Sequence, residues 1–402
     1  MATGYKFPIL NSDGTASGSK VDMEDMFVPK DQFLTAGLWA WGRDTEGQLG
    51  NNANQAFYDS PIQVGSLTNW KQASIGNKCA LAIKTDGTLW STGMGAYGQL
   101  GNSTNSYYSS PIQIGSLTNW KSVACGYAHT LSVKTDGTLW SWGLNYNTNI
   151  SAAFGQLGLG NTTVGYSSPV QVGSLTNWKQ VACGYYHSVA IKTDGTLWSW
   201  GQNDFGQLGN GTQNIKYSSP VQVGSLTSWK QVVAGNRYTI AIKNDGSLWA
   251  CGYNGNGELA VNLTNIHYSS PVQVGSLTNW KQVSAASGHC MATKNDGTLW
   301  SWGNNVYGNL GNGTTVKYIS PIQIGSLTNW KQASAGAGFS AAIKTDGTLW
   351  TCGYNSNRQL GNSATVNYSS PVQVGSLTSW KQVNAGLVSS MAILSPDYYY
   401  NQ

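Results

Sequence analysis

Residues 178–228 read WKQVACGYYHSVAIKTDGTLWSWGQNDFGQLGNGTQNIKYSSPVQVGSLTS, and most of the chain repeats this stretch with small changes. Two tryptophan series mark the copies. One, in Gly-Ser-Leu-Thr-(Asn/Ser)-Trp-Lys, falls at 70, 120, 178, 229, 280, 330 and 380, and the other, in Leu-Trp, at 39, 90, 140, 198, 249, 300 and 350. One longer step places an insertion at about Asn147–Ala153. A repeat of about 50 residues in seven copies predicts a modular architecture.

Each copy reads as four short strands and contains no stretch that suits a helix. Asp-Gly pairs at 86–87, 136–137, 194–195, 245–246, 296–297 and 346–347 separate the second and third strands. This dipeptide is typical of a two-residue type I′ hairpin. Seven units of four antiparallel strands predict an all-β fold, a seven-bladed β-propeller.

The two ends of the chain predict how the ring closes. The last copy, Trp380 to Leu394, lacks its Leu-Trp strand, whereas the first repeat element of the chain is that strand alone, with Leu38, Trp39 and Trp41. We expect this N-terminal strand to complete the C-terminal blade, because open sheet edges are unfavourable. The predicted organisation is an extension over 1–36, a propeller over 37–394 and a Tyr-rich tail over 395–402.

Composition narrows the class of protein. Charged residues make up 10% of the 402 residues, while Gly numbers 50 and Trp 18. No apolar run approaches the length of a membrane span, so no membrane insertion is expected. Residues 1–10 lack the sustained apolar stretch of a signal peptide, which favours synthesis in a cytoplasm. The six cysteines show no zinc-site spacing and are interpreted as small core residues.

The string Ala-Cys-Gly-Tyr-Tyr-His-Ser-Val-Ala-Ile-Lys-Thr-Asp-Gly-Thr-Leu-Trp-Ser-Trp-Gly, followed by Phe-Gly-Gln-Leu-Gly, resembles the regulator-of-chromosome-condensation repeat. The resemblance covers about residues 37–394 and implies a seven-bladed β-propeller. The family usually carries Gly-Gln-Leu-Gly, and departures here include Gly-Glu-Leu-Ala at 257–260 and Arg-Gln-Leu-Gly at 358–361. The family includes exchange factors, inhibitors, photoreceptors and scaffolds, so function must be sought in individual sites.

No catalytic or metal site is expected from the sequence. His129, His187 and His289 share one repeat position with Cys79, Tyr238, Phe339 and Ser389, which favours packing over chemistry. The carboxylates outside the turns are too scattered for an acid–base pair, and no nucleophile elbow or phosphate loop occurs. We therefore predict a protein that is not an enzyme and needs no cofactor.

Thirteen lysines belong to the repeat, one after each (Asn/Ser)-Trp and one before each Asp-Gly. Sevenfold repetition is expected to spread them around the ring without a single-sided phosphate-binding patch, so no nucleic acid partner is predicted.

Positions at which the copies differ are the candidates for binding. They follow the glycine that ends the first strand and fill the loop after Trp-Gly, where variable tips on a rigid ring carry specificity. Neutral drift in solvated loops is an equally good explanation. The candidate binding face comprises Asn77, Lys78, Tyr127, Tyr185, Tyr186, Asn236, Arg237, Asp204, Phe205, Tyr307 and Arg358.

The N-terminal 36 residues carry no repeat and are interpreted as an assembly arm. Its candidate contact residues are Tyr5, Phe7, Ile9, Leu10, Met23, Met26, Phe27 and Phe33.

The predicted function is structural or recognition, as a bacteriophage virion component such as an appendage, fibre or capsid-decoration protein. It would be made in the host cytoplasm, bind other virion proteins or its own copies through the arm, and recognise a host-surface protein or glycan. The alternatives are a bacterial surface or secreted protein-binding propeller of the inhibitor type, and an intracellular exchange factor or scaffold, which would be cytoplasmic.

Overall fold

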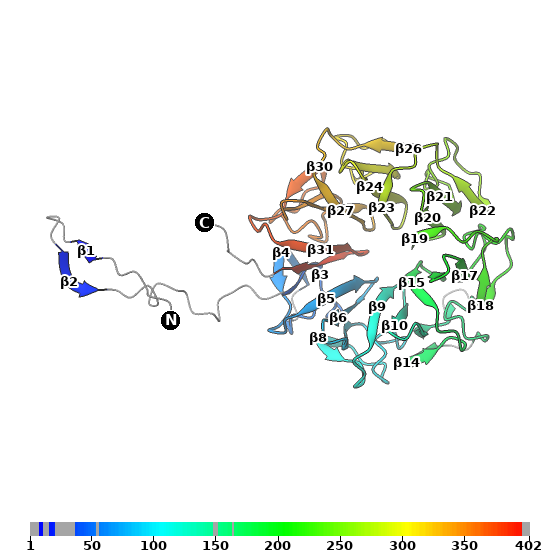
Figure 1. Ribbon diagram of the computed structural model, residues 1–402, viewed down its shortest axis with the longest axis horizontal. Coiled ribbons are helices and arrows are strands. Elements are labelled where there is room, and N and C mark those ends of the chain that lie inside the picture. Colours follow the sequence, from blue (N-terminus) through cyan, green and yellow to red (C-terminus); the bar gives the residue numbers. More distant parts are fainter. Residues whose placement is uncertain are drawn as a thin grey trace.

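The computed structural model describes residues 8–10, 16–20, 37–53, 56–147, 152–162 and 165–395. Seven four-stranded antiparallel sheets are arranged as blades around a central axis (Figure 1). The described residues contain strands and turns but no helix. The predicted all-β, seven-bladed propeller is therefore confirmed.

The four strands of each blade follow one another from the axis outward. The first two blades are β5 (Trp70–Ile75), β6 (Cys79–Lys84), β7 (Leu89–Gly93) and β8 (Tyr108–Gln113), followed by β9 (Trp120–Cys125), β10 (His129–Lys134), β11 (Leu139–Leu144) and β14 (Gly165–Gln171). The next four blades are β15 (Trp178–Cys183), β16 (His187–Lys192), β17 (Leu197–Gly201) and β18 (Tyr217–Gln222); β19 (Trp229–Ala234), β20 (Tyr238–Lys243), β21 (Leu248–Gly252) and β22 (Tyr268–Gln273); β23 (Trp280–Ala285), β24 (His289–Lys294), β25 (Leu299–Gly303) and β26 (Tyr318–Gln323); and β27 (Trp330–Ala335), β28 (Phe339–Lys344), β29 (Leu349–Gly353) and β30 (Tyr368–Gln373). The seventh blade consists of β31 (Trp380–Ala385), β32 (Ser389–Leu394), β3 (Leu38–Arg43) and β4 (Phe57–Gln63). Two small separate sheets are formed by β1 (Pro8–Leu10) with β2 (Ala16–Lys20), and by β12 (Tyr146–Asn147) with β13 (Ala152–Ala153) at the insertion.

The ring closes through a blade built from both ends of the chain. Strand β3 pairs antiparallel with β32, so that Leu38 lies opposite Ile393, Trp39 opposite Ala392 and Trp41 opposite Ser390. Strand β4 then adds to β3 as the outer strand. The predicted closure is confirmed, with two strands contributed by each end.

The Asp-Gly hairpins have a different turn from the predicted type I′. In the first, Gly87 donates to the carbonyl of Lys84 and Lys84 donates to that of Thr88, which closes a three-residue loop. Only Gly87 has positive φ, at 80°. The Asp86 carboxylate accepts from the backbone and hydroxyl of Thr88 at 2.9 and 2.7 Å, which fixes a type I turn followed by a glycine bulge.

Adjacent blades are joined near the axis by glutamine side chains. The Gln180 amide donates to the carbonyl of Val232 in the next blade at 3.0 Å and accepts from the same residue's N–H at 3.3 Å. The same two-bond contact, which we call the glutamine staple, is made by Gln72, Gln231, Gln282, Gln332 and Gln382. Ser122 occupies this position in β9, and its buried hydroxyl has no partner. The seam between β9 and β15 therefore lacks a staple.

Replacing Ser122 with Gln should stabilise the ring, because the new side chain can reach the backbone of Val181 as its counterparts reach theirs. We expect the free energy of unfolding to rise by about 1 kcal/mol, the net value of a hydrogen bond. Gln282→Ser is the matched control and should lower it by about as much. Urea unfolding measures both, and a destabilised S122Q protein would contradict the assignment.

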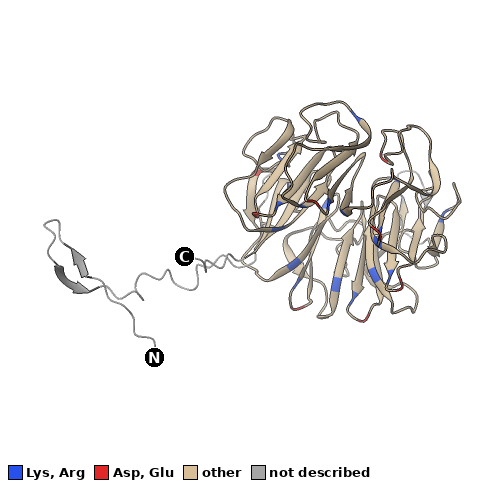
Figure 2. Ribbon diagram, turned by 45° about the horizontal axis from the view of Figure 1, so that its top comes forward, with Lys and Arg blue, Asp and Glu red and all other residues tan. Residues whose placement is uncertain are grey.

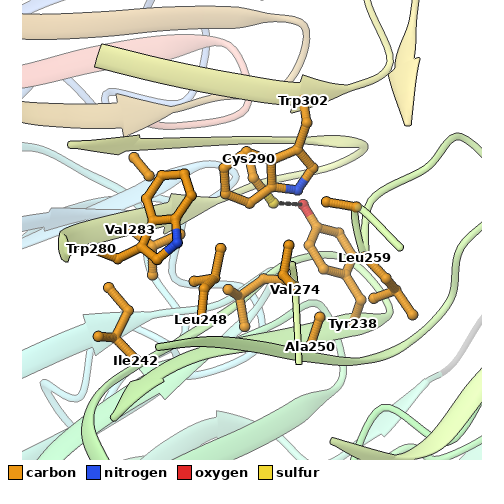
Figure 3. Packing of buried hydrophobic residues seen from close by; sticks show 13 residues of the cluster. Tyr238, Ile242, Leu248, Ala250, Leu259, Val274, Trp280, Val283, Cys290 and Trp302 are labelled. Carbon is orange, nitrogen blue, oxygen red and sulfur yellow. Dashed lines mark hydrogen bonds between the residues drawn. The ribbon is translucent and has the colours of Figure 1, made fainter. Parts of the chain in front are cut away.

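Aromatic and histidine side chains fill the spaces between blades. Figure 3 shows one such core, in which the Tyr238 side chain from β20 points toward Cys290 and Trp302 of the next blade. The Tyr238 hydroxyl donates to the carbonyl of His289 at 3.0 Å. The repeat position that Tyr238 occupies is buried in all seven blades, which confirms its predicted packing role.

The three histidines at this position lie wholly inside the ring. Their Nε2 atoms lie 3.0, 3.1 and 2.8 Å from hydroxyls of the next blade, those of Ser188, Thr239 and Ser340. Burial lowers the pKa of His129 to about 3, of His187 to about 3 and of His289 to about 4.

These histidines should make the fold acid-labile. The unfolded chain takes up protons below about pH 6.5 while the folded histidines stay neutral, so stability falls with pH down to about pH 4. Three such groups give a slope of up to about 4 kcal/mol per pH unit. His→Phe substitutions, chosen because Phe339 fills the same repeat position, should each remove about a third of that slope. Urea unfolding at pH 4.5–7.5 measures it, and an unchanged slope in the triple variant would refute the assignment.

Candidate binding face

The strand order gives the ring two chemically different faces. In every blade the first-to-second and third-to-fourth strand loops lie at one end of the strands, and these are the loops in which the copies differ. The Asp-Gly turns and the Gly-Ser-Leu-Thr loops lie at the other end, where Trp120 N donates to the carbonyl of Gly87 in the preceding blade at 3.1 Å. We call the first end the variable face and the second the constant face.

Two neighbouring aromatic clusters lie on the variable face and are together called the aromatic patch. The ring of Tyr127 lies 5.3 Å from Tyr185 and 5.6 Å from Tyr186, which belong to the next blade. The Arg237 guanidinium lies 5.2 Å from the ring of Phe205. Burial raises the pKa of both Tyr185 and Tyr186, and the nearby Arg237 charge opposes a small part of this rise. The structure thus gathers five of the predicted residues across three blades.

Other predicted residues are separate from this patch. Lys78 pairs with Glu46 at 2.9 Å, and the Asp204 carboxylate accepts from Gln202 at 2.7 Å. Tyr307 packs on Tyr354 at 4.6 Å between ring centroids. Asn77 lies at the mouth of the central channel, and the backbone of Asn236 bonds to the next blade.

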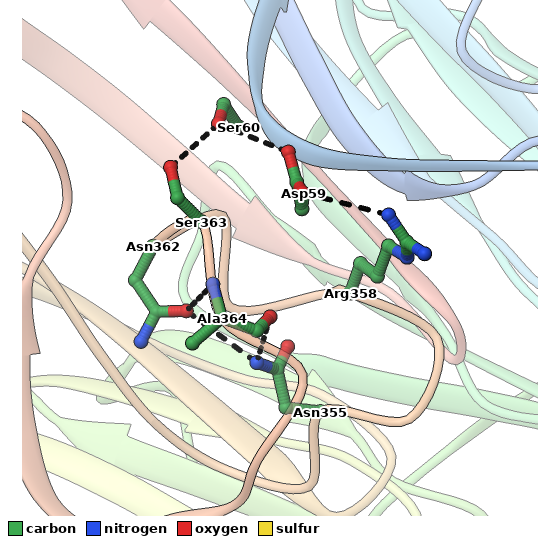
Figure 4. A network of polar contacts seen from close by, with 7 residues as sticks. All are labelled: Asp59, Ser60, Asn355, Arg358, Asn362, Ser363 and Ala364. Atoms are coloured by element: carbon green, nitrogen blue, oxygen red, sulfur yellow. Dashed lines mark hydrogen bonds and ion pairs between the residues drawn. The ribbon is translucent and has the colours of Figure 1, made fainter.

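Arg358 forms an ion pair between two blades. It contacts Asp59 of the closing blade at 3.4 Å, and beside this pair the Ser60 and Ser363 hydroxyls lie 2.9 Å apart (Figure 4). Arg358 also has a positive φ of 59°, at the place where the other blades have glycine. Its side chain links two blades at the closure of the ring.

Sequence reasoning missed two aromatic members of the patch, Tyr253 and His267, and the buried ring of Phe154 beneath it. Phe154 lies 5.1 Å from Tyr186, while Tyr253 and His267 stack at 5.1 Å and both contact Phe205. A signal for Phe154 was present, because the residue before Gly-Gln-Leu or its equivalent is aromatic in four copies, Tyr97, Phe154, Phe205 and Tyr307. Tyr253 and His267 lie at the two ends of the loop between β21 and β22, and the sequence alone does not show that their rings stack.

The axis opens onto the variable face through a small cavity of about 90 Å³. It is lined by the ends of the first strands, including Gly76, Gly126, Gly184 and Gly235. The Tyr185 hydroxyl reaches across to Ser287, two blades away, at 2.8 Å. The aromatic patch therefore extends to the channel mouth.

Two buried carboxylates replace amides on this face. Asp44 stands where five other blades have Asn, whose side-chain amide donates to a loop carbonyl, as Asn203 does to Thr212 at 3.0 Å. Oδ1 of Asp44 accepts from Leu49, but its buried Oδ2 has no partner, and burial raises the pKa to about 6. Burial also raises the pKa of Glu258, which replaces the Gln of other copies.

Asp44→Asn should stabilise the protein in a pH-dependent way. The folded-state pKa lies above the unfolded value of 3.8, so the stability contributed by the neutral carboxyl is present at low pH and lost as pH rises through 6. An amide that donates the missing hydrogen bond should raise the free energy of unfolding by about 1–2 kcal/mol at pH 8 and by less at pH 5. Equal gains at both pH values would contradict this account of Asp44.

Few groups with reactive chemistry come together. Among residues 37–395, leaving out the undescribed positions, no group of three or more His, Cys, Asp or Glu side chains is placed to hold a metal ion. All six cysteines are free, and burial raises the pKa of Cys183, Cys251, Cys290 and Cys352. In the part of the chain that is described, no helix is long and apolar enough to span a membrane.

The repeat lysines gather on the constant face, and the prediction of no single-sided patch is wrong. Each lies at the second position of a first strand or at the end of a second strand, beside an Asp-Gly turn where that turn is present. Figure 2 shows such basic bands on the strands close to turns whose tips are acidic. Counting the lysines around the ring did not reveal this, because the count ignored strand direction. Equivalent strands of all blades run in the same direction, so equivalent lysines lie at the same end.

Most of the predicted assembly arm lies outside the described residues. Ile9 and Leu10 lie in strand β1, which pairs with β2 through Pro8 opposite Lys20 and Leu10 opposite Ala16. The remaining arm residues, Tyr5, Phe7, Met23, Met26, Phe27 and Phe33, lie outside the described residues, as do residues 396–402 of the tail.

Comparison with known families agrees with this architecture. Residues 149–392 match the RCC1-like domain, and residues 36–83 and 86–133 match the regulator of chromosome condensation (RCC1) repeat. The chain belongs to the RCC1 repeat family. Together these matches span nearly the whole ring.

Animal and plant proteins are among the curated relatives. The chain is 36% identical over 165 residues to the probable E3 ubiquitin-protein ligase HERC6 of Homo sapiens, covering 39% of this chain and 16% of HERC6. It is 31% identical over 282 residues to the ultraviolet-B receptor UVR8 of Arabidopsis thaliana, covering 69% of this chain and 62% of UVR8. The chain thus matches less than two thirds of the length of either relative.

Solved structures share the fold. Prp20p from Saccharomyces cerevisiae superposes with a TM-score of 0.80 at 18% identity, over 91% of this chain and 93% of Prp20p. Human WBSCR16 gives a TM-score of 0.79 at 22% identity, over 90% of this chain and 99% of that protein.

These relatives correct two expectations. Probable E3 ubiquitin-protein ligases, HERC6 and HERC4, contain stretches similar to this propeller, so the family occurs within enzymes and the prediction that this protein is not an enzyme is wrong. The bacteriophage membership, and with it the virion location and partners, gains no support from relatives in Homo sapiens, Rattus norvegicus and Arabidopsis thaliana.

Proposed function

We propose that the protein is a protein-recognition propeller that binds its partner through the aromatic patch of the variable face. The patch consists of Tyr127, Tyr185, Tyr186, Phe205, Arg237, Tyr253 and His267, and the buried ring of Phe154 supports it from below. The observation that carries the proposal is the contrast between this patch and a framework that is otherwise nearly the same in every blade.

The chemistry of the patch suits a protein partner. Tyr and Arg are enriched at interface hot spots because they bury a large area and also offer hydrogen bonds. Arg237 is exposed while its guanidinium lies over Phe205, so its remaining donors face outward. The rings pack on one another, so few rotamers need to be frozen on binding.

Fold relatives favour the exchange-factor or scaffold reading over a virion role. Prp20p has been characterised for binding to Gsp1p and histones, and yeast RCC1 (Prp20) has been crystallised bound to Kap60. A small GTPase is therefore the first partner to test, by measuring release of a fluorescent guanine nucleotide from a panel of GTPases.

The decisive experiment compares two surfaces of the same protein. Tyr127→Ser, Tyr185→Ser and Arg237→Ala together should abolish partner binding, with a loss of at least 100-fold in affinity from about 2 kcal/mol at each hot spot. A control with Lys121→Gln, Lys281→Gln and Lys381→Gln changes only the constant face and should keep the affinity. A partner retained by the first variant and lost by the control would overturn the proposal.

The N-terminal 36 residues keep their proposed role as an assembly arm, separate from the patch. Its test is the oligomeric state of the full chain and of a variant beginning at residue 36, measured by light scattering. The shortened chain retains β3 and so keeps the closing blade. An unchanged mass would contradict an arm that joins copies of the chain.

A further inference from the structure

The constant face differs from the variable face in charge. Thirteen lysines and six aspartates of the described ring lie on it, whereas the variable face carries six basic and five acidic side chains. The basic residues of the variable face are Arg43, Lys78, Lys216, Arg237, Lys317 and Arg358, and the acidic ones are Asp44, Glu46, Asp59, Asp204 and Glu258. Nearly all of the net positive charge of the ring therefore gathers at one end.

The lysines of this face form two classes. Six lie at the end of a second strand beside the tryptophans, as Lys294 does 3.4 Å from the Trp300 ring centroid, and their charge is balanced by the aspartate of the adjacent turn. The other seven, at the second position of each first strand, are exposed in every blade. They are Lys71, Lys121, Lys179, Lys230, Lys281, Lys331 and Lys381.

Leucines accompany these lysines. The Gly-Ser-Leu-Thr loop that precedes each first strand leaves its leucine 45–48% exposed in five blades, at Leu117, Leu175, Leu226, Leu277 and Leu327. The constant face therefore presents a ring of free ammonium groups together with a ring of protruding apolar side chains.

We propose that the constant face docks on an anionic lipid surface. A protein partner is asymmetric, so residues that differ between blades would recognise it. This face instead presents the same lysine in seven blades and the same exposed leucine in five. A bilayer presents identical headgroups everywhere and so matches a repeated contact. Lysines near an anionic bilayer and apolar side chains at its boundary are the two signals that stable peripheral binding needs.

The proposal is independent of the protein partner proposed above. The two surfaces lie at opposite ends of the strands, so a propeller docked on lipid would still present its aromatic patch. Loss of one binding activity leaves the other to be measured on the same variant.

Sedimentation with vesicles tests the docking. The full chain should bind vesicles of 70% phosphatidylcholine and 30% phosphatidylserine at 50 mM salt, should bind more weakly at 500 mM because of screening, and should not bind pure phosphatidylcholine. Lys121→Gln, Lys230→Gln and Lys331→Gln together should weaken binding by about 100-fold, since each lysine near such a surface is worth about fivefold. The corresponding Lys→Arg variant should bind as the unchanged chain does.

Two controls separate this surface from general charge. Lys216→Gln, Arg237→Gln and Lys317→Gln remove the same charge from exposed sites of the variable face and should leave vesicle binding within about threefold, since they lie beyond a Debye length from the docked face. Leu117→Ser, Leu226→Ser and Leu327→Ser should remove the binding that persists at high salt. Circular dichroism melting checks that every variant is folded.

Three results would overturn the proposal. They are no binding of the full chain to the anionic vesicles at 50 mM salt, an equal loss in the variable-face control, and binding to a 20-base-pair DNA duplex without binding to vesicles. The last result would assign the lysine ring to nucleic acid instead.

Discussion

The glutamine staple is the contact on which the ring depends. The first strand of each blade is a sheet edge, and its backbone N–H and C=O groups need partners. A glutamine amide offers one donor and one acceptor, so it pairs with one residue of the next blade as another strand would. Six seams are joined in this way, including the closing seam, where Gln382 pairs with Ala73.

The exceptional seam lies beneath the aromatic patch. Ser122 gives the β9–β15 boundary no staple, and the same boundary carries the contacts of Tyr127 with Tyr185 and Tyr186. His129 also crosses it to reach Ser188. Side-chain packing at the channel mouth and the buried histidine therefore join these two blades where the staple is absent. The ring contacts within the patch are therefore also contacts between two blades.

Much of the fold could be predicted from the repeat. The strand count, the closing blade and the burial of His129, His187 and His289 all follow from the pattern of equivalent positions. The turn type did not follow, because the Asp86 carboxylate binds Thr88 and selects a type I turn that the dipeptide alone does not specify. The prediction that the protein is not an enzyme was wrong for a different reason, because a propeller can be one part of a larger protein.

The candidate site was predictable only in part, because its contacts join residues about 50 positions apart. Tyr127, Tyr185 and Tyr186 could be identified as variable, but their stacking depends on how neighbouring blades are inclined. The sidedness of the lysines required strand direction as well as position in the repeat. Counting repeats identifies the residues of the framework. The composition of a surface also depends on which residues lie at the same end of the strands.

The departures from the framework give an independent reason to look at the variable face. Asp44 buries an oxygen without a partner, Glu258 buries a carboxyl where other copies have an amide, and Arg358 holds a left-handed backbone conformation that other copies give to glycine. Each of these costs stability. All three lie in loops of the variable face. The Asp-Gly turns and the lysines of the constant face, by contrast, are the same from copy to copy. Local rules are most often broken where function requires it. These three departures from the repeat therefore lie on the same face as the aromatic patch, although none of them is one of its rings.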